Sequence, residues 1–218
     1  MELKKLGLVL KKRLENSLPG QDSHWKMLPI ERRPAMKYID GNPVPRPSSI
    51  LILLYPMGNY FGTILIRRTQ DLSVHSGQIS FPGGKQDPTD LSPVHTALRE
   101  AEEEINLQSG RVEILGKLSP LYVSPSNFEI TPVVGYIDDP GKLTANPTEV
   151  DEIIEIPLND LVSFRTNVDI SVREFLLKQV PCFNIHSNIV WGATAMILQE
   201  LLDVLADIQE PGPTINNY

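Results

Sequence analysis

Two consecutive segments of strand length constrain the fold most. Residues 50–55 (ILILLY) are an unbroken apolar run, and residues 60–68 (YFGTILIRR) follow after the four turn residues PMGN. The short turn between two apolar segments predicts an antiparallel hairpin. A glycine-rich loop at 81–85 (FPGGK) then leads to a predicted helix from about 92 to 106. Such a mixture favours an α+β fold with helices flanking a mixed sheet.

The remaining elements follow from apolar periodicity and from turn residues. We expect strands at 112–123, 130–137, 150–156 and 175–185, a short helix at 157–164, and a final helix from about 188 to 208. At the N-terminus, residues 1–17 predict an amphipathic helix, and residues 18–48 are expected to form an extended connector. The 218 residues suit a single domain with a catalytic core at about 30–205. The tail at 210–218 is expected to be mobile.

Composition narrows the classes of protein. The net charge of −7 and the pI near 5.1 argue against a nucleic-acid-binding surface. Cys182 is the only cysteine, so an intrachain disulfide is impossible and a cytoplasmic setting is expected. No apolar run approaches the roughly 18 residues of a membrane span, and we expect no membrane partner.

The segment 96–107 (TALREAEEEINL) carries the strongest chemical signal. Glu100, Glu103 and Glu104 stand at i, i+3 and i+4, which places them in one sector of a helix, whereas Glu102 points elsewhere. They occupy the last two turns, where the helix dipole disfavours each anion by roughly 0.3–1 kcal/mol. No lysine or arginine shares their stripe, although Arg99 flanks it.

A bound cation would relieve this repulsion. Carboxylate oxygens suit a hard ion, Mg²⁺ or Mn²⁺, and Mg²⁺ commonly shares its coordination shell with substrate phosphates. Gly83 and Gly84, in the preceding loop, allow the backbone to approach a ligand closely, and Lys85 adds a cation where a phosphate could lie. The sequence therefore predicts a metal-dependent phosphoryl site.

These residues resemble the Nudix box, G-x5-E-x7-R-E-U-x-E-E-x-G-U, with Gly84 as the first glycine and REAEEE at 99–104 as its core. Asp90 stands in place of the first Glu, one residue further from Arg99, and Asn106 replaces the late Gly, a mild change since Asn also tolerates the left-handed conformation. The resemblance implies an α/β/α sandwich and metal binding by Glu100, Glu103, Glu104 and the Gly84 carbonyl. It also implies catalysis that involves Glu103, Glu104 and Arg99.

The segment at 64–90 is similar to the motif of coenzyme A pyrophosphatases, LLTxR(S/A)xxxRxxxGxxxFPGG, through residues that include Arg68 and Gly83. Thr69 and Ser73 depart from it, because Ser73 stands where the motif has a second Arg. This resemblance implies hydrolysis of coenzyme A, or a derivative, to 3′,5′-ADP and 4′-phosphopantetheine. Residues expected to contact this substrate are Arg68, His75, Gly83 and Lys85.

Other interpretations stay open. The chain could hydrolyse another diphosphate (ADP-ribose, a dinucleotide or a nucleoside triphosphate), or it could be a catalytically silent ligand-binding module. At most one of Glu149 and Glu152 is expected to reach the site, because they face opposite sides of a strand. Tyr122 and Phe128 could line an adenine pocket, although core packing is the ordinary role of strand aromatics. The N-terminal helix and the proline-rich connector could support a homodimer.

Overall fold

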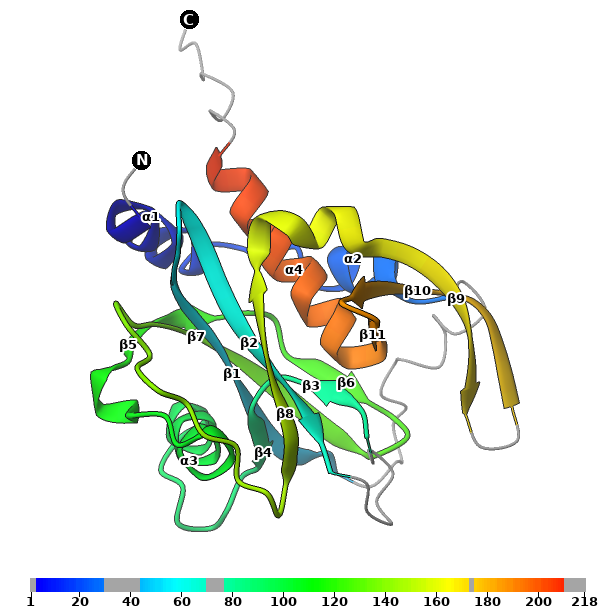
Figure 1. Cartoon of the computed structure of the whole chain (residues 1–218), viewed down its shortest axis with the longest axis horizontal. Coiled ribbons are helices and arrows are strands. Elements are labelled where there is room, and N and C mark those ends of the chain that lie inside the picture. The colour runs from blue at the N-terminus through cyan, green and yellow to red at the C-terminus, as the bar shows by residue number, and fades with distance from the viewer. Residues whose placement is uncertain (1–2, 30–43, 70–76, 173–174, 210–218) are drawn as a thin grey trace, which may run out of the picture.

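The predicted hairpin forms the centre of a mixed sheet. The computed structural model describes residues 3–29, 44–69, 77–172 and 175–209 (Figure 1). Strand β1 (Arg46–Met57) pairs antiparallel with β2 (Tyr60–Arg68) and parallel with β7 (Phe128–Tyr136). The turn is shorter than the sequence predicts, because β1 continues to Met57 and Gly58 turns the chain with a φ of 63°.

Five shorter or outer strands complete this sheet around the central three. On one side, β8 pairs with β2 and β3 pairs with β2; on the other, β5 and β6 pair with β7, and β4 pairs with β1. Their bounds are β3 Ile79–Ser80, β4 Gly83–Lys85, β5 Glu113–Lys117, β6 Leu121–Val123 and β8 Val150–Pro157. The strand predicted at 112–123 is therefore two strands. The glycine-rich loop is in part a strand, because Gly83 adopts a φ of 153° while pairing with Ile50.

The sheet is buried on both faces, and its central strand shows why. Side chains of successive strand residues point to opposite faces. Leu51 and Leu53 belong to the core shared with helix α3 (Pro93–Ile105), and Ile52 and Leu54 belong to the core shared with α4 (Gly192–Gln209). Each of these four strand side chains is 0% exposed. Burial of each contributes about 1.5–3 kcal/mol.

Helix α1 (Leu3–Leu14) packs with α4 on the second face, and α3 covers the first (Figure 1). The three layers confirm the predicted α+β fold of the α/β/α type. Leu6, Leu10 and Leu14 of α1 are buried, as expected for an amphipathic helix. The division of the chain into one domain stays a prediction.

Helix α3 begins and ends where the sequence places it. Ser92 is the N-cap, and its side chain accepts a hydrogen bond from the backbone N–H of His95 at 3.2 Å. Pro93 occupies the first turn, where its missing N–H has no partner to lose. Asn106 ends the helix with a φ of 55°, the left-handed conformation that the sequence permits at this position.

The C-terminal part differs from the prediction. A second sheet, absent from the sequence-based expectation in this form, contains β9 (Arg165–Val172), β10 (Phe175–Ile185) and β11 (Asn188–Val190) in the order β11-β10-β9. The last helix therefore starts at Gly192 rather than near 188, because residues 188–190 pair with β10 instead. The short helix predicted at 157–164 is a 3-10 helix, η4 (Leu158–Phe164).

The connector predicted to be extended contains two helical turns, α2 (Gln21–His24) and the 3-10 helix η1 (Trp25–Met27). His24 and Gly20 bind the buried carboxylate of Glu200 on α4, at 2.9 and 3.1 Å. That contact fixes residues 20–24 against α4, so this part of the connector is not extended, and residues 30–43 of it lie outside the described residues. The predicted tail at 210–218 lies outside the described residues.

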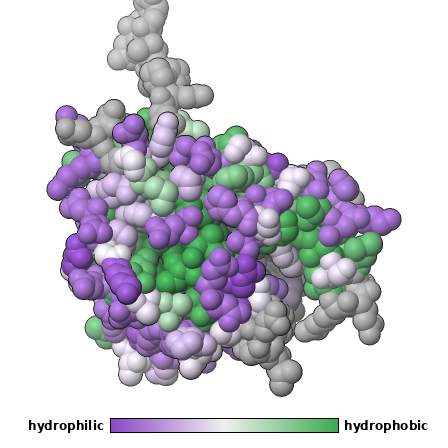
Figure 2. Space-filling view, in the orientation of Figure 1, coloured by the Kyte–Doolittle hydropathy of each residue, from purple (hydrophilic) through white to green (hydrophobic). Residues whose placement is uncertain are grey.

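The surface is mostly polar, with apolar side chains showing at the centre of one face and over the β9–β10 hairpin (Figure 2). Leu176 on β10 is an exposed apolar side chain, at 56%. Within the described ranges, no helix is long and apolar enough to cross a membrane.

Candidate active site

Glu104 is the buried centre of the acidic helix. Its side chain is 0% exposed and accepts hydrogen bonds from the backbone N–H of Gly83 and from Arg68 Nη1, each at 2.8 Å. Burial raises the pKa of Glu104 to about 7, even though Gly83 and Arg68 stabilise the charged form. Desolvation therefore outweighs the ion pair at this carboxylate.

Glu100 lies one turn earlier against the glycine pair. A Cβ atom added to Gly84 would lie 2.5 Å from the carboxyl carbon of Glu100, so any larger residue would displace this carboxylate from its position against the strand. The Glu100 side chain is 14% exposed, and burial raises its pKa despite the neighbouring Arg99. The two glycines thus have different tasks, because Gly83 donates to Glu104 and Gly84 makes space for Glu100.

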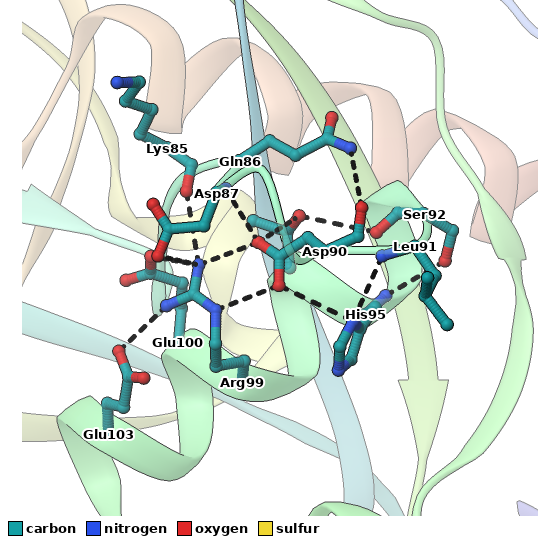
Figure 3. A network of polar contacts seen from close by, with 11 residues as sticks. Lys85, Gln86, Asp87, Asp90, Leu91, Ser92, His95, Arg99, Glu100 and Glu103 are labelled. Carbon is teal, nitrogen blue, oxygen red and sulfur yellow. Dashed lines mark hydrogen bonds and ion pairs between the residues drawn. The ribbon is translucent and has the colours of Figure 1, made fainter.

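Arg99 joins the acidic residues of the helix to the preceding loop (Figure 3). Its guanidinium contacts Glu103 Oε2 and Glu100 Oε1, both at 2.9 Å, and donates to the Lys85 carbonyl at 3.3 Å. These charged partners raise the pKa of Arg99 further above its usual value, with Asp90 as the largest contributor. Arg99 thus holds Glu100 and Glu103 beside the loop that precedes the helix.

Asp90 holds Arg99 from the other side. Its carboxylate receives Arg99 Nε at 3.0 Å and Nη2 at 2.9 Å, which is a bidentate ion pair. The backbone N–H of Asp87 and the hydroxyl of Thr96 also donate to it, at 2.9 and 3.0 Å. The Arg99 guanidinium holds the pKa of Asp90 well below its usual range. Asp90 is shorter than the glutamate of the Nudix box and stands one residue further from Arg99 in sequence, yet its carboxylate still reaches the guanidinium.

The sequence-based charge argument requires a correction. It leaves the acidic stripe without a cation, whereas Arg99 binds Glu100 and Glu103, and Arg68 from strand β2 binds Glu104. Arg68 lies 36 residues away in sequence, so helix periodicity could not reveal it. Glu102 does point elsewhere, as predicted, and accepts a hydrogen bond from the hydroxyl of Ser109.

The three glutamates of the helix have two arginine partners, because Glu100 and Glu103 share Arg99 whereas Glu104 binds Arg68. Glu103 is half-exposed beside Arg99, whereas Glu104 is buried beside Arg68. Within the part of the chain that the structure describes, no three acidic, histidine or cysteine side chains converge closely enough to hold a metal ion as they stand. A cation bound by all three would therefore require these side chains to move closer together than they stand.

Lys85 and Glu149 border the same region. Lys85 is exposed, its ammonium points away from the Arg99 network in Figure 3, and no ion-pair partner for it exists among the described residues. Glu149, just before β8, is close enough for its charge to contribute to the raised pKa of Glu100 and Glu104. Glu152 instead binds Arg67 at 2.7 Å, so only one of the two glutamates faces the site, as predicted.

Two sequence-based expectations concern residues without a described position. His75 and Ser73 lie in the segment 70–76, outside the described residues.

Tyr122 and Phe128 are described, and both are half-buried rather than part of the core. The core interpretation of these two aromatics was therefore wrong.

A helix that presents carboxylates to a Gly-Gly strand, at the edge of a mixed sheet between two helical layers, is the arrangement of a Nudix hydrolase. The NUDIX domain model matches residues 45–178, and the chain belongs to this family. It is 40% identical over 140 residues to a protein named Uncharacterized Nudix hydrolase NudL from Photorhabdus laumondii, covering 63% of this chain and 74% of that protein. A NudL protein of Yersinia pestis is 40% identical over 139 residues, covering 63% and 69%.

Solved structures support the fold. The Nudix hydrolase RenU from M. smegmatis aligns with a TM-score of 0.50 and 18% identity, covering 79% of this chain and 91% of that one. A C. elegans Ap4A hydrolase aligns with a TM-score of 0.52 and 13% identity, covering 74% and 98%. At these identities the likeness concerns the fold alone.

Nudix hydrolases generally use divalent metals, and the chemistry of this site suits one. Glu100 and Glu104 are buried enough that burial raises their pKa values, which a nearby cation would reverse. Oxygen ligands of this kind suit hard cations. Because Gly84 has no Cβ, the Glu100 carboxylate lies directly against this strand, beside the Gly84 backbone.

Proposed function

We propose that this chain hydrolyses the diphosphate of coenzyme A, or of a derivative, to 3′,5′-ADP and 4′-phosphopantetheine with the help of Mg²⁺ or Mn²⁺. The observation that carries the proposal is the position of two carboxylates against the Gly83–Gly84 strand, the buried Glu104, which is bonded to Gly83, and the partly buried Glu100, which lies against Gly84. Beside them, Lys85 offers an ammonium without an ion-pair partner among the described residues. A polyanion that arrives with its cations fits this distribution of charge.

Glu100, Glu103, Glu104 and the Gly84 carbonyl would hold the metal. A divalent cation bound there supplies charge neutralisation of the diphosphate and a lower pKa for the attacking water. The protein's own arginines prepare these ligands, because Arg99 fixes Glu100 and Glu103 while Arg68 fixes Glu104. Arg99 and Arg68 therefore keep the carboxylates in place before the ion binds.

Substrate contacts are assigned to residues at the edge of β4. Lys85 would bind a phosphate oxygen, and the Gly83 backbone lets the substrate approach the strand closely. Arg68 is 32% exposed and would contact the substrate from the same side while it holds Glu104. Glu103 and Glu104 would be the catalytic carboxylates, and Arg99 would orient them.

The choice of coenzyme A comes from the motif at 64–90, which resembles coenzyme A pyrophosphatases. The departure at Ser73 keeps ADP-ribose as the second candidate, because an arginine that could bind an anionic part of coenzyme A is missing there. A panel of diphosphates, assayed by phosphate release after phosphatase coupling with Mg²⁺, Mn²⁺ or EDTA, separates the candidates. We expect coenzyme A to be the best substrate and EDTA to abolish turnover.

Other outcomes of the panel point elsewhere. Equal or faster turnover of ADP-ribose contradicts the coenzyme A assignment and favours the second candidate. Ligand binding without turnover of any diphosphate would indicate a silent module. Turnover that survives EDTA would contradict the metal assignment.

The role of the helix is tested separately by replacing Glu103 with Gln. We expect turnover to fall by orders of magnitude and the melting temperature to change little, because this side chain is 50% exposed. Glu102→Gln is the matched control, since Glu102 lies next in sequence and binds Ser109 instead. Near-normal activity of the Glu103 variant would remove this carboxylate from the mechanism.

A further inference from the structure

Arg46 and Phe128 form a stacked pair at the start of strands β1 and β7. The guanidinium carbon of Arg46 lies 4.2 Å from the centre of the Phe128 ring. Arg46 is held at two further points, because Nη2 donates to the Ser126 carbonyl at 2.7 Å and its backbone N–H donates to the Asn127 carbonyl at 2.8 Å. The guanidinium is therefore fixed over the ring.

One side of this pair is open. Arg46 is exposed and Phe128 is half-buried, so the guanidinium side that faces away from the ring is accessible to solvent. Among the described residues, no carboxylate forms an ion pair with Arg46. The pair thus presents a flat, positively charged surface that is already desolvated on one side.

The register of the sheet places this surface beside strand β4, which carries Gly83, Gly84 and Lys85. Lys85 pairs with Ser48, Ser48 pairs with Ile130, and Arg46 pairs with Phe128 two residues earlier. Side-chain alternation puts Lys85, Arg46 and Phe128 on one face of the sheet. From strand spacing and rise, the Cα atoms of Lys85 and Arg46 are about 8 Å apart.

Tyr122 belongs to a different surface. It pairs with Glu129, the neighbour of Phe128, so its side chain points to the opposite face of the sheet. Its hydroxyl also donates to Asn127 Oδ1 at 3.0 Å. Of the two strand aromatics, only Phe128 shares a face with Lys85.

We propose that Arg46, supported by Phe128, is the stacking surface for the purine base of the substrate, with Lys85 on its phosphates. The proposal rests on the proposed diphosphate hydrolysis and adds the base-binding residue. A planar guanidinium stacks on nucleobases, and its positive charge also suits a polyanionic nucleotide. A base on Arg46 would make a three-layer stack of base, guanidinium and phenyl ring.

Calorimetric titration with ADP and with inorganic pyrophosphate, both in Mg²⁺, tests this directly. The excess affinity of ADP over pyrophosphate reports the nucleoside part. We expect Arg46→Ala to weaken ADP binding about 5- to 150-fold, the range for loss of one base stack, and to leave pyrophosphate binding unchanged. Arg46→Lys keeps the charge without the plane, so it should weaken ADP binding as the alanine variant does.

Arg165→Ala is the matched control, because Arg165 also lies over an aromatic ring, that of Phe183 at 5.9 Å, but on the second sheet. This variant should bind ADP normally. The proposal is overturned if the unmodified protein shows no excess affinity for ADP, if Arg46→Ala retains that excess, or if Arg46→Lys restores it. A loss of melting temperature in Arg46→Ala without any change in ADP affinity would mean that Arg46 only fastens the Ser126 turn.

The two proposals fail independently. Absence of diphosphate turnover, with an ADP excess that disappears in Arg46→Ala, leaves the stacking surface in place and removes the enzymatic assignment. Turnover of coenzyme A that is insensitive to Arg46→Ala in both KM and kcat leaves the enzyme in place and removes the stacking surface.

Discussion

Replacement of Asp90 by alanine would release Arg99 from the loop before α3. The Asp90 side chain is 0% exposed and receives two bonds from Arg99, one from Thr96 and one from the Asp87 backbone. Breaking a buried ion pair by removal of one partner destabilises a protein by about 3–5 kcal/mol. Arg99 is 21% exposed, so water can partly solvate the released guanidinium. We therefore expect a loss of about 3 kcal/mol, at the lower end of that range.

This loss has a thermal and a pH signature. For a protein of this size, about 3 kcal/mol corresponds to a decrease of roughly 6–12 °C in melting temperature. The pKa of Asp90 is held below its usual value by the hydrogen bonds from Arg99, so its stabilisation is present at neutral pH. It is lost as the pH falls through the folded pKa. The stability difference between the two proteins should therefore shrink below about pH 4, the usual aspartate pKa.

Thermal melts at pH 7 measure the first signature, and denaturant melts at several pH values measure the second. Asp87→Ala is the control, because Asp87 is 56% exposed and its carboxylate lies 3.9 Å from Arg99. An exposed pair of this kind contributes at most about 1 kcal/mol. If Asp90→Ala costs no more than Asp87→Ala at pH 7, or if their difference stays constant into acid, the assignment of Asp90 as the anchor of Arg99 is wrong.

Two further predictions test the Gly83–Gly84 strand and the contact of Gly20 and His24 with Glu200. Gly84→Ala would push against the flexible end of Glu100, so we expect a strong loss of turnover with little change in melting temperature. Gly110→Ala is the control, because the added Cβ meets nothing within 4 Å, and it should change neither turnover nor melting temperature. Unimpaired turnover in Gly84→Ala would refute the tight contact. Glu200→Ala removes a 0% exposed carboxylate and should lower the free energy of unfolding by about 3–5 kcal/mol in denaturant melts. Asp207→Ala removes the 54% exposed partner of Arg13 and should lower it by at most about 1 kcal/mol. Equal losses would contradict the view that Glu200 fastens the N-terminal segment to α4.

Much of the architecture could be predicted from local sequence patterns. Helix α3 is readable because its apolar residues, its Ser92 cap and its Asn106 end all lie within one continuous segment. The β1–β2 hairpin is readable for the same reason, since its two apolar runs need only a short turn. Elements whose signals are local could thus be placed before any tertiary contact was known.

The sequence by itself determined the acidic stripe of α3 and the glycine pair that precedes it, because both are properties of neighbouring residues. Only the tertiary structure decided which cations meet that stripe, since Arg68 reaches Glu104 from another strand. It likewise decided that residues 188–190 pair with β10 and that Arg46 lies over Phe128, 82 positions along the chain by their numbers. Pairings of this kind depend on how strands align across the sheet, and helix or strand periodicity contains no information about that alignment.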